Sequence, residues 1–145
     1  MMDKKLAGTI KTAKDLDKPE YTIVTKLGVT GEIATKKFFK KAKIVTFETE
    51  ADAAAEVLNG KAAAMVYDQP YNVLFMSDKG KDKLVHLDTP LTYEPLGWAI
   101  RKGDPDFLNW LNNFLRQSQE DKVVGFSDEL YQKWLVETDW LQRVQ

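Results

Sequence analysis

Cysteine is absent from the sequence, and histidine occurs only once, as His86. The chain can therefore form no disulfide, thiolate nucleophile or Cys-based zinc site, and a His-rich metal site is excluded as well. The longest uninterrupted apolar run, residues 62–67, is far shorter than the roughly 20 residues that cross a bilayer as a helix. Lys and Arg total 21 and Asp and Glu total 22, so the sequence lacks the cationic surplus that nucleic-acid binding requires. No feature indicates a metal or an organic cofactor.

Strand and helix patterns alternate along the first half of the chain. The β-branched stretches 21–27 and 43–47 predict two strands, and the apolar run 63–67 predicts a central strand that is buried on both faces. Residues 31–39 and 49–58 have the periodicity of amphipathic helices, the second with a capping signal at its start. This alternation predicts an α/β fold with a mostly parallel sheet flanked by helices.

The second half continues this pattern and then changes. A helix is expected from Pro70 to about Met76, and strands are expected over 84–87 and 96–100. We interpret His86, in the first of these strands, as a structural residue, because it has no nearby Ser or Cys to pair with. Two amphipathic C-terminal helices are predicted, over 106–118 and 128–141, and both have wide apolar faces.

Asp68 is the first candidate site residue, because it stands at the carboxyl end of the buried central strand. Open α/β sheets bind their ligands at that edge, and a carboxylate there can pair with an ammonium group. Asp68 could equally cap the helix that begins near Pro70, and its position in the sequence favours neither role.

The segment from Gly28 to Glu32 is the second candidate. Gly28 allows a tight turn after the first strand, Thr30 is a suitable N-cap residue, and the free N–H groups of the next turn, at and after Gly31, attract an anion. A capped helix with nothing bound is the alternative interpretation. An ammonium-binding Asp and a carboxylate-binding helix start at one sheet edge suit an α-amino acid. Neither supplies a nucleophile or an acid–base pair, so binding is expected rather than catalysis.

These stretches resemble the family 3 periplasmic solute-binding proteins, the amino-acid receptors of ABC importers. The resemblance is carried by residues 14–16, 28–32, 56–61, 67–70, 93–104 and 130–134. It implies a periplasmic binding protein-like type II lobe, in a fold where the ligand sits between two lobes.

The resemblance also implies roles for single residues. Asp68 matches the Asp that binds the ligand's α-ammonium group. Thr30, with the backbone amides next to it in the Gly28–Gly31 segment, matches the position that holds the α-carboxylate. Lys26 and Tyr67 match positions that line the pocket for the ligand's side chain.

The sequence departs from the family pattern in several places. Val29 replaces a usual Thr, Ala63 replaces a usual Asp, and the Asp-Gly-Thr motif before the last helix is altered at 121–125. Most of the family's first lobe has no counterpart, including its carboxylate-clamping Arg. We therefore expect residues 1–95 to form lobe two, and residues 96–145 to form a hinge strand and the helices that normally return to lobe one.

The resemblance further implies an amino-acid ligand, a membrane permease as the partner of the full receptor, and a periplasmic or extracellular location. The first eight residues have no apolar core and are not expected to be a signal peptide. The apolar faces of the C-terminal helices predict a homodimer. Two other functions stay open: a sensory ligand-binding module, and an enzyme resembling cyclohexadienyl dehydratase that would have to use Asp68, Glu32 and Glu94.

Overall fold

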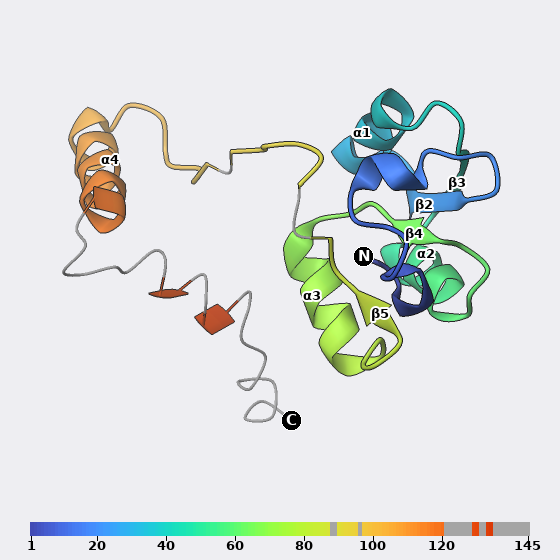
Figure 1. Ribbon diagram of the computed structural model, residues 1–145. Helices are drawn as coiled ribbons and strands as arrows, with labels where there is room; N and C mark the ends of the chain where they lie inside the picture. The colour runs from blue at the N-terminus through green and yellow to red at the C-terminus, as the bar shows by residue number, and fades with distance from the viewer. Residues whose placement is uncertain (88–89, 96, 121–128, 131–132, 135–145) are drawn as a thin grey trace. The chain divides into compact units, whose positions relative to one another are not determined.

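The computed structural model describes residues 1–87, 90–95, 97–120, 129–130 and 133–134 (Figure 1). The chain divides into two compact units, Met1–Tyr93 and Glu94–Gln145. The first unit contains all the strands that the structure describes. Its elements are β1 (Met2–Asp3), the 3-10 helices η1 (Lys4–Leu6) and η2 (Ala13–Leu16), β2 (Thr22–Lys26), α1 (Thr30–Phe38), β3 (Lys43–Phe47), α2 (Glu50–Leu58), β4 (Ala64–Met65), α3 (Gln69–Asp78) and β5 (Leu84–Val85).

The first unit is built on a five-stranded sheet in the order β3-β2-β4-β1-β5. β2 pairs in parallel with β3 on one side and with β4 on the other, whereas β1 is antiparallel to β4 and to β5. The register places Ile23 opposite both Ile44 and Ala64. The carboxyl ends of β2, β3 and β4 therefore meet at one edge of the sheet. The expected α/β fold is confirmed, but the sheet is mixed, because both pairings of β1 are antiparallel.

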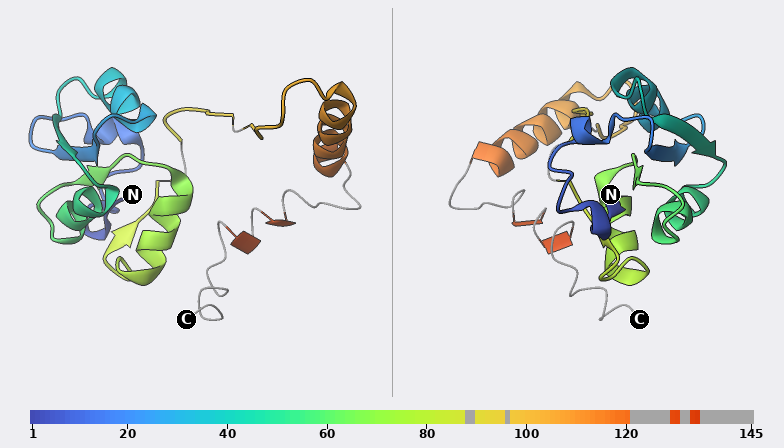
Figure 2. Two further views of the ribbon diagram at one scale, coloured as in Figure 1. Left: turned by 180° about the vertical axis from the view of Figure 1, so that it is seen from behind. Right: turned by 45° about the vertical axis from the view of Figure 1, so that its right-hand side comes forward.

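Helices cover both faces of this sheet, and Figure 2 shows the arrangement from two further directions. Adjacent residues of β2 point to opposite faces, so Ile23 and Val24 are both buried but belong to different apolar clusters. Val24 packs with the buried residues of α2 and with aromatic residues after β4 and on α3. Ile23 packs with the end of α1 and with the segment around η2. The sheet is thus the middle of three layers, which is typical of α/β folds.

The capping signal at the start of α2 is confirmed. Thr49 is the N-cap residue, and its hydroxyl oxygen accepts a hydrogen bond from the Asp52 N–H at 3.1 Å. The helix ends at Leu58, and Gly60 then takes a positive φ of 70°. This combination of polar N-cap and C-terminal Gly explains why the sequence located the helix well.

Several predicted strands are shorter than expected or missing. β4 pairs only over Ala64–Met65, although the apolar run extends from 63 to 67, and β5 ends at Val85, before His86. Residues 97–100 form no strand, so the strand predicted over 96–100 is wrong for the described part of that stretch. On either side of β4, Ala63 and Val66 still donate backbone hydrogen bonds to the Thr22 and Val24 carbonyl oxygens of β2, at 2.8 and 3.0 Å, so the contact with β2 extends past the two assigned residues.

The second unit contains α4 (Pro105–Glu120), which begins one residue before the predicted start at Asp106 and extends past Ser118. The Asp104 carboxylate accepts a hydrogen bond from the Phe107 N–H at 2.9 Å, and Pro105 occupies the first turn, where its missing N–H leaves no gap. The helix predicted over 128–141 and the altered motif at 121–125 lie largely or wholly outside the described residues.

Candidate functional site

Four of the predicted site residues follow β2 or end it, and two follow β4. Because these strands are neighbours and parallel, both sets reach the same edge of the sheet. The approach is close: a methyl group added at Gly31 would lie 3.5 Å from the Val66 carbonyl oxygen. The start of α1 therefore lies against the end of β4, and the juxtaposition on which the amino-acid site depends is present.

Gly28 has a φ of 77°, a conformation that favours glycine, and it forms the turn that the sequence predicted. Its N–H donates to Glu32 Oε2 at 2.7 Å, so one of the amides near the helix start already has a carboxylate partner. The bond from Lys36, followed by the bond from Gly28, holds the pKa of Glu32 below its ordinary value. Glu32 is thus a structural anion that keeps this loop closed.

Thr30 is the first residue of α1, and Val29 occupies the N-cap position without a side-chain hydrogen bond. The expectation that Thr30 caps the helix is wrong, because the turn at Gly28 lets the helix begin one residue earlier. Thr30 is exposed at the sheet edge. Close to the neighbouring Gly31, the hydroxyl of Thr25 is fully buried and has no hydrogen-bond partner among the residues that the structure describes.

Asp68 occupies the N-cap position of α3, but its side chain makes no capping hydrogen bond. Its carboxylate is exposed at the sheet edge. Of the two roles that the sequence left open, capping is not observed, so the carboxylate remains available to an ammonium group. The turn itself is held by Asn72, whose backbone N–H donates to the Asp68 carbonyl oxygen at 3.1 Å and whose side-chain amide donates to the Tyr67 carbonyl oxygen at 2.9 Å.

Sequence reasoning missed Asn72 as a positioning residue. It is 2% exposed, and a buried Asn on a helix that is otherwise apolar on its inner side was the available signal. Burying an amide is favourable only when it is hydrogen-bonded, and here the NH2 group is bonded to the turn that presents Asp68, whereas Oδ1 has no partner among the described residues.

Lys26, the last residue of β2, forms an ion pair with Glu50, the first residue of α2. Lys26 Nζ lies 2.7 Å from Glu50 Oε2, and about a third of each side chain is exposed, 30% and 32%. The bond from Glu50 raises the pKa of Lys26, and the same bond lowers the pKa of Glu50, so both are charged at neutral pH. Glu50 was not predicted as a partner of Lys26, because no local pattern connects residues that are 24 positions apart.

Tyr67 extends this group of side chains toward Asp68. Its ring contacts that of Tyr71 edge-to-face, with centroids 5.2 Å apart, and the Tyr71 ring stacks in turn on Phe75. Burial raises the pKa of Tyr71, and the charge of Glu50 adds to the effect. Lys26, Glu50, Tyr67 and Tyr71 therefore form a cluster, which we call the side-chain cluster, beside the edge that carries Asp68.

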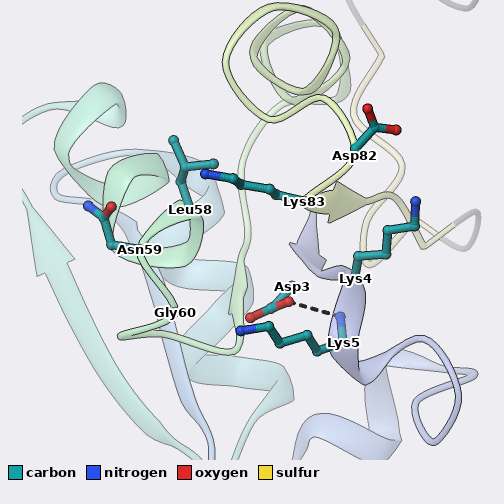
Figure 3. A pocket seen from close by; sticks show the side chains of 8 residues that line it. All are labelled: Asp3, Lys4, Lys5, Leu58, Asn59, Gly60, Asp82 and Lys83. Atoms are coloured by element: carbon teal, nitrogen blue, oxygen red, sulfur yellow. Dashed lines mark hydrogen bonds between the residues drawn. The ribbon is translucent and has the colours of Figure 1, made fainter.

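A hollow of about 410 Å³ lies at the opposite edge of the sheet, where β4 and β5 begin (Figure 3). Its lining residues come from β1, η1, the end of α2 and the turn before β5: Asp3, Lys4, Lys5, Leu58, Asn59, Gly60, Asp82 and Lys83. It contains none of the predicted site residues. Among the described residues no group of three potential metal ligands occurs, and no described helix is long and apolar enough to span a membrane.

No protein-family model matches the chain. It is 28% identical over 134 residues to the ABC transporter glutamine-binding protein of Bacillus subtilis (strain 168), a match that covers 92% of this chain and 46% of that protein. The chain thus spans about half the length of this curated relative.

Two solved structures are more similar. One is a binding component of an ABC transporter from Wolinella succinogenes DSM 1740, complexed with lysine, at 60% identity and a TM-score of 0.76. That match covers 97% of this chain and 59% of the other. The second is an ancestral cationic amino acid solute-binding protein, at 46% identity and a TM-score of 0.74, which covers 92% of this chain and 56% of the other. The chain is therefore a relative of the amino-acid-binding solute-binding proteins of ABC transporters. The similarity covers nearly all of this chain and about half of the length of those proteins.

Proposed function

We propose that the chain binds the α-amino acid group of a cationic amino acid at the edge formed by the ends of β2 and β4. The observation that carries this proposal is the exposed Asp68 carboxylate, which makes no cap with its own helix and follows β4, whose carboxyl end lies against the start of α1. Asp68 would pair with the ligand's ammonium group. The first backbone amides of α1, with Thr30, would hold its carboxylate.

The choice of a cationic amino acid is supported by the two similar structures, one complexed with lysine and one a cationic amino acid solute-binding protein. Because Val29 replaces the Thr that is usual in the family, one hydroxyl group is missing from the part of the site that would hold the ligand's carboxylate. Binding of the carboxylate would then depend more heavily on backbone amides, which are unaffected by the substitution.

The wider role follows from the same relationship. We propose that the chain acts as part of the receptor of an ABC importer, with a membrane permease as partner and a location outside the cytoplasmic membrane. Binding rather than catalysis is supported by the site itself, where the described residues offer Asp68 as an acceptor but no acid–base pair with it.

We also propose that the chain forms a homodimer through α4. The rings of Phe107, Trp110 and Phe114 stack along one face of this helix, with centroids 6.2 and 5.9 Å apart. The three side chains are 45%, 61% and 39% exposed. An apolar face of this kind favours association, and a second copy offers a matching face.

The amino-acid proposal is tested by NMR titration of the isotopically labelled chain with lysine, arginine, glutamine and glutamate, up to millimolar concentrations. Because the site presents groups from one sheet edge, we expect millimolar dissociation constants, equivalent to about −4 kcal/mol. Shifts should cluster at residues 26–32 and 67–69 and disappear in Asp68→Ala. The exposed Asp78→Ala, at the end of α3, is the matched control and should bind normally. Shifts spread over other surfaces, or unchanged by Asp68→Ala, would contradict the proposal.

A further inference from the structure

The side-chain cluster joins three parts of the molecule that are distant in sequence. Lys26 ends β2, Glu50 begins α2, and the two tyrosines follow β4 and lie on α3. Two other ion pairs in the described part of the chain, Glu32 with Lys36 and Glu56 with Lys61, join residues four or five positions apart within their own segments. The Lys26–Glu50 pair instead lies at the edge that the ligand would occupy.

Stability alone does not account for this pair. Both side chains are about one-third exposed, and ion pairs with that exposure contribute little to folding, because water competes for each charge. The pair nonetheless places a carboxylate at an open edge, within electrostatic range of Tyr71, whose ring packs against that of Tyr67. That arrangement suggests a role in recognition.

The two charges differ in how easily each can leave the other. Glu50 has a short side chain on the first turn of α2, where the helix dipole favours a negative charge. Lys26 reaches Glu50 through a flexible four-carbon stem that can turn into solvent at small cost. A ligand that enters the cluster would therefore displace Lys26 and leave Glu50 in place.

The aromatic neighbours favour the same outcome. Faces of tyrosine rings attract cations and not anions, and Tyr67 and Tyr71 both lie within electrostatic range of Lys26. The Glu50 carboxylate has more acceptor positions than the single bond to Lys26 uses. A cationic group that replaces Lys26 would find an acceptor and aromatic surface together.

We propose that Glu50 is the acceptor for the cationic side chain of the bound amino acid, and that Lys26 is its counter-ion in the empty site. The inference rests on the proposed function, since it assigns the side-chain end of the same site. The ligand's ammonium or guanidinium group exchanges with the Lys26 ammonium group on Glu50, and no covalent bond changes.

The test compares dissociation constants for lysine, arginine and glutamine, measured by NMR titration of the full chain. In Glu50→Gln we expect lysine and arginine to bind roughly tenfold more weakly, with glutamine nearly unchanged, because a charge-assisted bond becomes a neutral one. In Lys26→Met we expect lysine to bind several-fold more tightly, because the competing cation is gone. Glu48→Gln, at an exposed carboxylate two residues before Glu50, is the matched control and should change none of the three.

The outcomes separate the two proposals. If no amino acid binds the unmodified chain, both fail. If amino acids bind through Asp68 but the ratio of lysine to glutamine affinity is the same in all variants, only the role of Glu50 is overturned. If Glu50→Gln does not fold, Lys26→Met decides alone: a purely structural ion pair predicts lysine binding that is unchanged or weaker, and partner exchange predicts tighter binding.

Discussion

The backbone conformation of Gly28 forms the turn that leads from β2 into α1 at the candidate site. Its φ of 77° places it in the left-handed region, which costs a residue with a Cβ about 1–2 kcal/mol. No atom lies within 4 Å of the position that a Cβ would occupy, so this cost comes from the backbone and not from a clash. We expect Gly28→Ala to lower the free energy of unfolding by about 1 kcal/mol in urea denaturation followed by circular dichroism.

The matched control for this prediction is Gly8→Ala. Gly8 also has open space around it, but its φ is not positive, so its substitution should change the free energy of unfolding by less than about 0.5 kcal/mol. Equal effects at the two positions would mean that the turn at Gly28 is not strained by a side chain.

Some of the site residues could be predicted from the sequence and others could not. The turn at Gly28 and the position of Asp68 at a strand end were predictable, because Gly after a strand and Asp before a Pro-initiated helix are local signals. Glu50 was not, because its partner Lys26 lies in another element, and Asn72 left only the weak signal of a polar residue on a largely apolar helix. A residue whose role is set by a tertiary contact leaves no local trace in a single sequence.

Among the contacts that connect one element with another, the Asp17 side chain links the end of η2 to the turn before β3 by hydrogen bonds. Its Oδ1 atom accepts hydrogen bonds from the N–H groups of Lys40, Lys41 and Ala42, at 2.8, 2.7 and 3.1 Å. The bond from Lys41 contributes most to lowering the pKa of Asp17. One carboxylate thus fixes the connection that leads from α1 into the edge strand of the sheet.

This connection predicts how stability depends on pH. A carboxylate whose pKa is lower in the folded state stabilises the protein above its unfolded pKa, about 3.9 for Asp, and the contribution is lost as the pH falls through the folded value. The pKa values of Asp15, Glu32 and Glu50 are lowered as well, chiefly by hydrogen bonds that these carboxylates accept. We expect the thermal midpoint to fall as the pH is lowered from 5 toward 3.

The variant Asp17→Asn isolates one part of this dependence. Its midpoint should be lower than that of the unmodified chain at pH 7, and it should lose less between pH 5 and 3, because one titrating group is gone. Asp78→Asn, at the exposed end of α3, serves as the control. An acid dependence in Asp17→Asn as steep as in the unmodified chain would contradict the assigned role.

Element types were easier to predict than element limits. Helices with polar caps, such as α2, were located to within a residue, because the cap and the terminal Gly are encoded next to the helix. Strand lengths were overestimated, since β4 and β5 each pair over two residues while their apolar runs continue. β1 was missed, because two residues at the start of the chain carry no alternation and pair only with strands far along the sequence.

At the scale of the whole molecule, the described residues of the two units differ in how much apolar surface they bury. The sheet unit encloses its aliphatic residues between helices on two faces, whereas α4 presents stacked aromatic rings on its exposed face. An aromatic side chain carries a large apolar area, so leaving three of them exposed on one helix is costly in water. Association through this face would recover that area.

The exposed aromatic rings of α4 are the reason for proposing a homodimer. The mass of the particle in solution is measured by light scattering coupled to size-exclusion chromatography. We expect the unmodified chain to have twice the monomer mass of 16.6 kDa, and Trp110→Asp to shift it toward the monomer, because a buried charge opposes association. Asn109→Asp adds the same charge beside Trp110 without removing a ring, and it should stay dimeric. A monomer at high concentration in the unmodified chain would rule the dimer out. A dimer that survives Trp110→Asp would instead place the contact on another surface.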